Sequence, residues 1–208
     1  MEDIRVGGEQ FVEMRDSGKL PYGQLPVLQV DDGVYLAQSS AILRYVGKYA
    51  GLYPTEDLVQ AAIIDSLLDE EIDLFTGLAV TRYKGEYHYI FPYFRIDHIP
   101  IHIDRMGFGS LDNEAVLKIR AKLNDDILPK HLQFLENFLI KSPTGWLAGG
   151  IKPSIAEFGL VPRLQWLATP GLHDGISDNI LEKFPMVKEL IHRFMQLPEI
   201  QAYYNKQQ

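Results

Sequence analysis

The sequence predicts a small α/β domain at residues 1–52 and an all-helical domain at residues 55–208, joined through Pro54. Up to Gly51 the predicted segments are short and separated by turn residues. After Gly51, apolar residues recur at helical spacing over long stretches. Hydrophobic residues make up 46% of the 208 residues, which is enough for a sizeable core. We therefore expect an α/β plus all-α protein.

The composition argues against several classes of protein. The chain has 20 Lys and Arg against 28 Asp and Glu, a net charge of −8 with no basic cluster, so we expect no nucleic-acid partner. It has no cysteine, which excludes a disulfide scaffold, thiolate catalysis and thiolate metal sites. Met1 opens no signal-peptide pattern and no apolar run reaches membrane-spanning length, so we expect a cytoplasmic protein without a membrane partner.

The first 51 residues predict a short series of strands and helices. Residues 4–6 alternate like a strand, and residues 11–15 predict a short helix or turn. Residues 25–30 and 34–36 flank an Asp-Asp-Gly turn, which predicts a β-hairpin because Asp-Gly accepts positive φ angles. A helix follows from Ala41 and ends at Gly51, a typical C-cap.

Two positions beside this hairpin suggest a binding site. Pro26 cannot donate to a sheet, so it is expected where a strand begins, and a cis Leu25–Pro26 bond would turn the backbone of Leu25 toward a peptide-like ligand. Gln38 and Ser39 open the following helix, where backbone amides and the helix dipole favour negative charge. The pair would suit an α-carboxylate beside an amino group. The alternative is that Ser39 serves only as an N-cap.

The second region is predicted to be helical almost to its end. The expected helices cover residues 58–82, 115–140 with a kink at Pro129, 180–195 and 198–204. Ser154 and Glu157 have the spacing of a capping box, which predicts the start of another helix.

Several motifs together resemble a soluble glutathione transferase, most closely the sigma-like branch near the alpha, mu and pi groups. The motifs are GQLPVL at 23–28, DG at 32–33, LAQS at 36–39, AI at 41–42, RY at 44–45, RYK at 82–84, LPKHL at 128–132 and SIAE at 154–157. The resemblance implies a thioredoxin-like domain, a helical-bundle domain, a homodimer, and glutathione as cosubstrate with a small hydrophobic electrophile.

The resemblance also implies how glutathione is bound. The γ-glutamyl carboxylate would lie on Gln38 and Ser39, the cysteinyl backbone would pair with Leu25 beside cis-Pro26, and Gln24 would help to hold the peptide.

Four further residues are assigned by the same resemblance. The glycyl carboxylate would meet Arg15 or Lys19, which stay alternatives, and Phe11 falls where sigma-like members often place a tryptophan beside the glycyl end. Asp73 matches an acidic residue that reaches glutathione's amino group across the dimer interface. The alternative for Asp73 is a solvated helix face that continues the acidic run at 69–71.

Two departures from the family bear on activity. The strand and helix that precede residue 2 in the family, with the catalytic Tyr or Ser, are expected upstream of Met1, so no residue of this chain is predicted to be catalytic.

Residues 85–104 form an unusual aromatic insert that is interpreted as a substrate lid, a structural insertion of the lens-crystallin kind, or a retained intron. His98 and His102 lie in it, but Pro100 between them argues against a shared helix face, and no metal site is predicted.

The predicted function is conjugation of the glutathione thiolate to electrophilic or hydroperoxide substrates, or glutathione-dependent isomerisation. The alternative is a non-catalytic relative that binds glutathione or apolar ligands, or serves a structural role.

Overall fold

The structure is a computed structural model that describes residues 3–31, 33–82, 113–171 and 175–206. The insert predicted at 85–104, with His98 and His102, lies outside these residues. The described helices and strands, in chain order, are α1 Gly8–Asp16, β1 Val27–Asp31, β2 Val34–Ala37, α2 Ser39–Ala50, α3 Leu58–Arg82, α4 Asn113–Lys122, the π-helical segment η2 Leu123–Ile127, α5 Leu128–Lys141, α6 Ile155–Leu167, the 3-10 segment η3 Ile180–Lys183, α7 Pro185–Met195 and α8 Pro198–Asn205.

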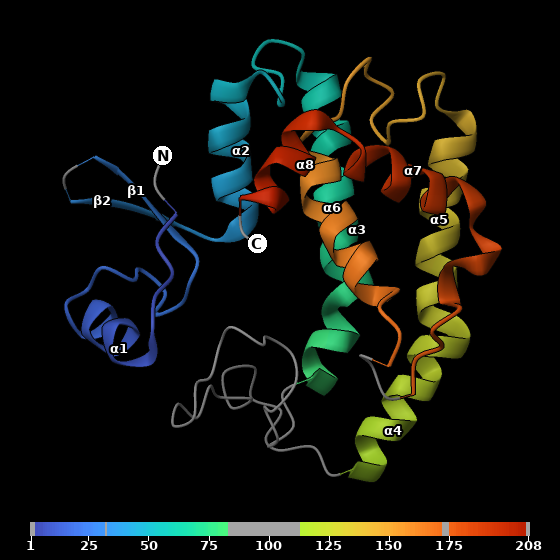
Figure 1. Ribbon diagram of the computed structural model, residues 1–208, viewed down its shortest axis with the longest axis horizontal. Helices are drawn as coiled ribbons and strands as arrows, with labels where there is room; N and C mark the ends of the chain where they lie inside the picture. Colours follow the sequence, from blue (N-terminus) through green and yellow to red (C-terminus); the bar gives the residue numbers. More distant parts are fainter. Residues whose placement is uncertain (1–2, 32, 83–112, 172–174, 207–208) are drawn as a thin grey trace.

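The first part of the chain holds α1 and an antiparallel hairpin of β1 and β2, to one side of the long helices (Figure 1). Val27 faces Ala37 in the register, and the hairpin turns at Gly33, whose φ of 84° confirms the predicted Asp-Gly turn. The strand predicted at residues 4–6 is wrong. These residues have no assigned secondary structure and no described strand beside them, and Ile4 is exposed, so neither pairing nor burial makes them a strand.

The core of the molecule lies in the helical part, around α6. This helix packs against α3, α2 and α7, and its residues Leu160, Val161 and Leu164 are fully buried (Figure 1). The predicted capping box is present, because Ser154 accepts a hydrogen bond from the Ala156 amide and Glu157 accepts one from the Ser154 amide.

The helix predicted at 115–140 is present, and its irregularity is a π-helical segment, Leu123–Ile127, immediately before Pro129. A proline inside an α-helix clashes with the carbonyl four residues earlier, and a wider π-turn at that point relieves the clash. Within the described ranges, no helix is long and apolar enough to cross a membrane.

Candidate functional site

A pocket of about 90 Å³ lies where the hairpin meets the first turn of α2. Its lining residues come from the segment before β1, from the end of β2 and from the start of α2: Tyr22, Gln24, Leu25, Pro26, Ala37, Gln38 and Ser39. The structure thus brings together five of the nine residues predicted to bind a ligand. The prediction does not include Tyr22 and Ala37, of which Ala37 directly precedes Gln38 and Tyr22 lies two residues before Gln24.

The local backbone explains why these residues converge. The Leu25–Pro26 bond is cis, as expected, and Pro26 directly precedes β1. Gln38 has a φ of 76°, a left-handed conformation that residues other than glycine adopt rarely and often at functional sites. This turn at Gln38 joins β2 to α2, so the first residue of the helix, Ser39, faces the pocket.

The alternative that Ser39 is only an N-cap is wrong. Gln38 occupies the N-cap position, and no side chain makes a capping hydrogen bond at this end of α2. The first amides of a helix have no carbonyl within the helix to bond, and the helix dipole adds partial positive charge there. The pocket wall at Ser39 therefore suits a negatively charged group.

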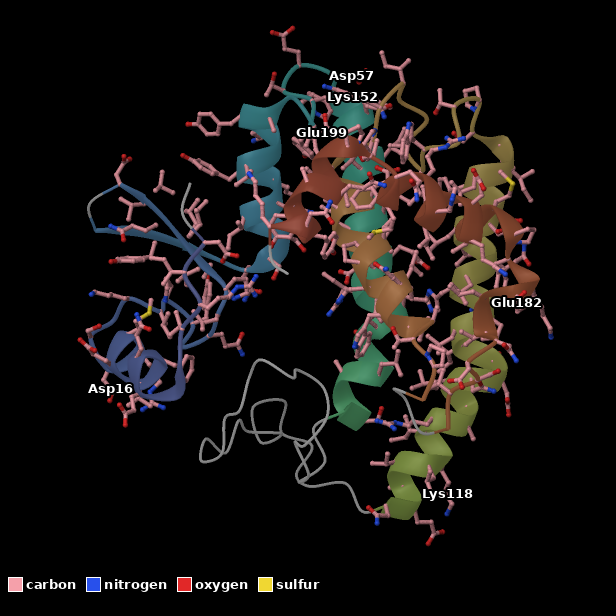
Figure 2. All side chains as sticks on the ribbon, in the orientation of Figure 1. Asp16, Asp57, Lys118, Lys152, Glu182 and Glu199 are labelled. Carbon is pink, nitrogen blue, oxygen red and sulfur yellow. The ribbon has the colours of Figure 1, made fainter. Side chains whose placement is uncertain are left out.

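The residues predicted to bind a second carboxylate of the ligand lie on α1 and just after it. Arg15 runs beside Gly23, since a Cβ built on Gly23 would lie 3.9 Å from Arg15 Cγ. The side chain of Arg15 is half-exposed and pairs at 2.9 Å with Asp16, which Figure 2 labels. Lys19 is exposed beyond the end of α1, and Phe11 is half-buried on α1. The choice between Arg15 and Lys19 stays open.

Asp73 is exposed on α3, away from the pocket lining. Its predicted role needs a second subunit, so it stays a prediction. The neighbouring acidic run is not a uniformly solvated face. Glu70 lies 2.5 Å from His131 Nδ1, and Glu71 is only 8% exposed and pairs with Arg163.

A hydrogen-bonded cluster fixes α2 against the helical domain. Asp65 on α3 accepts a bond of 2.6 Å from Arg44 and one of 2.9 Å from Tyr53. The hydrogen bond to Asp65 raises the pKa of Arg44, and burial, followed by the bond to Asp65, raises the pKa of Tyr53. Both groups therefore stay protonated and keep donating. Because Arg44 is on α2, the cluster also holds the position of the pocket wall.

The part of the chain that the structure describes contains no group of three or more His, Cys, Asp or Glu side chains that could hold a metal ion. The hydroxyl and amide groups of the pocket suit an organic anion instead.

The chain is similar to known proteins along almost its whole length. The model of the glutathione S-transferase N-terminal domain matches residues 9–48, and that of the C-terminal domain matches residues 105–207. Glutathione S-transferase 1 of Ascaris suum is 36% identical over 148 residues, which cover 71% of this chain and 59% of that relative, less than two thirds of its length.

Two further likenesses cover more of both proteins. Probable glutathione S-transferase 5 of Caenorhabditis elegans is 30% identical over 205 residues, 97% of this chain and 82% of the relative. The solved prostaglandin synthase D of Nilaparvata lugens has a TM-score of 0.72 at 26% identity, over 100% of this chain and 85% of that one. The likenesses confirm the predicted fold class, a small α/β part followed by a helical bundle. This chain belongs to the glutathione S-transferase family.

Proposed function

We propose that this chain binds glutathione in the pocket between the hairpin and α2. We further propose that the protein uses the glutathione thiolate to attack small hydrophobic electrophiles or hydroperoxides, or uses glutathione in isomerisation. The observation that carries the proposal is the convergence of Gln24, Leu25, Pro26, Gln38 and Ser39 on one pocket. Residues 1–52 would form the thioredoxin-like, glutathione-binding domain, and residues 55–208 the helical domain.

In this proposal the γ-glutamyl end of glutathione enters the pocket. Its carboxylate meets the first amides of α2 and the Ser39 hydroxyl, and the Gln38 side chain lies beside it. At about 90 Å³ the pocket is smaller than typical ligand pockets of roughly 300–1,000 Å³, so it would hold one end of the tripeptide. The cysteinyl backbone would then run past Leu25.

The other end of glutathione would extend toward α1. The side chain of Arg15 runs beside Gly23, the neighbour of the lining residue Gln24. It would bind the glycyl carboxylate by releasing Asp16, or Lys19 would do so, with Phe11 packing alongside. Asp73 would reach the amino group of glutathione bound to the second subunit of a homodimer.

The described residues would provide binding and orientation in this reaction. The sulfur–carbon bond forms when the glutathione thiolate attacks the electrophile, while the thiol proton passes to solvent and the leaving group departs with its electron pair. Activation of the thiol would fall to a hydroxyl outside the described residues. A cytoplasmic location follows from the same family assignment as part of the proposal.

Calorimetric titration of the full chain tests the proposal. Glutathione should bind, and cysteinylglycine, which lacks the γ-glutamyl group, should bind at least about tenfold more weakly because the charge-assisted bonds at α2 are lost. Equal binding of both peptides, or binding of neither, would refute it. Conjugation of 1-chloro-2,4-dinitrobenzene, measured in parallel, separates a transferase from a relative that only binds glutathione.

A further inference from the structure

Residues 17–23, which join α1 to the pocket, are folded back by two turns. The first is a Schellman motif at the end of α1, in which Gly18 has a φ of 77° and its amide donates to the Arg15 carbonyl. The second is closed by a hydrogen bond of 2.8 Å from the Gly23 amide to the carbonyl of Leu20, which is only 4% exposed. Gly23 lies between two residues that line the pocket, and a Cβ built on it would lie 3.9 Å from Arg15 Cγ. The last turn of α1 is therefore held next to the pocket.

The Arg15 guanidinium at this position already binds a carboxylate from its own helix. Its Nε donates to Asp16 Oδ1 at 2.9 Å, and the two side chains are 46% and 62% exposed. A guanidinium binds a carboxylate best through two parallel N–H bonds, and Asp16 occupies the edge that contains Nε. An incoming carboxylate must therefore replace Asp16 or bind in the field of its negative charge. Because an exposed ion pair contributes little, exchanging one carboxylate for another on Arg15 should leave the free energy almost unchanged.

The position of Asp16 does not serve the helix. Asp16 is the last residue of α1, where the helix dipole favours Lys or Arg and opposes an acidic side chain. Residues that break a local rule of this kind are expected near functional sites. Control of the Arg15 charge explains this aspartate better than support of the helix does. It also follows that Asp16→Asn should fold at least as well as the unaltered chain.

We propose that Asp16 determines specificity by competing with the glycyl carboxylate of the ligand for Arg15. This inference rests on the proposed function, and it takes Arg15 as the residue that the glycyl carboxylate meets. The γ-glutamyl end in the pocket then provides most of the affinity, and the net charge of −8 adds a general repulsion against a further anionic group. The thiol cosubstrates of this site are therefore γ-glutamyl peptides as a class, including those whose glycyl end carries no charge.

Calorimetric titration with two thiols tests the inference without requiring turnover. Glutathione and glutathione amide differ only in the glycyl end, which is a carboxylate in one and a neutral carboxamide in the other. The unaltered protein should bind them with dissociation constants within about threefold of each other. In Asp16→Asn the freed Arg15 should bind glutathione about 3- to 5-fold more tightly, while the affinity for glutathione amide changes less than about twofold.

Two further variants identify the cause of that gain. Arg15→Met combined with Asp16→Asn should remove it, whereas a gain carried by Lys19 would remain. Glu9→Gln removes a negative charge from the first turn of the same helix without touching this ion pair, so it should change both affinities less than about twofold.

The outcomes separate this inference from the proposed function. A preference of the unaltered protein for glutathione of more than about threefold would overturn the inference and leave the proposed function intact. An absent gain in Asp16→Asn, an equal gain for both thiols, or a gain that remains in the double variant would do the same. Failure of glutathione to bind the unaltered protein would overturn the proposed function and this inference with it.

Discussion

Replacement of Ser39 by alanine separates ligand binding from folding at the proposed site. In most helices a serine at the N-terminus caps the helix, and its removal costs about 1 kcal/mol of stability. Here the N-cap is Gln38, and no side chain caps α2. Ser39 is exposed and lines the pocket, so its hydroxyl is available to a ligand. We therefore expect the free energy of unfolding to change by less than about 0.5 kcal/mol.

The expected loss in binding follows from the charge of the ligand. A hydrogen bond to a charged group contributes about 1.5–3 kcal/mol, and the open position of Ser39 favours the lower part of that range. A loss of about 1.5–2 kcal/mol corresponds to roughly 10- to 30-fold weaker binding of glutathione.

Calorimetric titration with glutathione, together with urea denaturation, measures both quantities. Ser40→Ala is the matched control, because Ser40 is the next residue of α2 but does not line the pocket. Unchanged affinity in both Ser39→Ala and Gln38→Ala would refute the assignment of the γ-glutamyl carboxylate to this helix end. A large loss of stability in Ser39→Ala would show instead that the hydroxyl has a structural role.

Three further predictions concern the support of the site. Gly47→Ala should destabilise the protein by about 1–3 kcal/mol in urea denaturation, because its Cβ would collide with Ile155. The control Gly7→Ala should not destabilise it, because the space around Gly7 is open. Equal effects of the two substitutions would contradict this prediction. Asp65→Asn should lower the free energy of unfolding by about 1 kcal/mol, because it weakens the hydrogen bonds that the partly exposed Asp65 carboxylate accepts from Arg44 and Tyr53. An unchanged denaturation midpoint would argue against a role of Asp65 in holding α2. Burial raises the pKa of Glu157, so the folded chain keeps this proton to a higher pH than the unfolded chain. The stabilisation from this protonation is complete below the ordinary pKa of about 4.5 and is lost as the pH rises through the raised pKa. The stability of the unaltered protein relative to Glu157→Gln should therefore fall as the pH rises above 4.5, and a relative gain would contradict it.

The features predicted correctly from sequence depend on short, local signals. The Asp-Gly turn, the C-cap at Gly51 and the Ser154 capping box each need only a few neighbouring residues to form, and all are present. The core of the pocket was also predictable, because a family resemblance pointed to Gln24, Leu25, Pro26, Gln38 and Ser39 together. The domain boundaries and the roles of the binding residues stay predictions.

The features that sequence reasoning missed depend on packing between distant segments. Glu71 and Arg163 are 92 residues apart, and Glu70 and His131 are 61 apart, so nothing in their local patterns shows that they pair. For this reason the sequence could not show that the acidic run beside Asp73, whose alternative interpretation is a solvated helix face, contains paired carboxylates. The strand expected at residues 4–6 failed because alternation alone does not make a strand, which also needs a partner to bond.

A crystal structure of the full chain soaked with glutathione tests the central claim most directly. The account predicts the γ-glutamyl carboxylate within hydrogen-bond distance of Ser39 at the N-terminus of α2, and the cysteinyl backbone beside Leu25. Glutathione bound at a different place, with the pocket between the hairpin and α2 left to solvent, would contradict it.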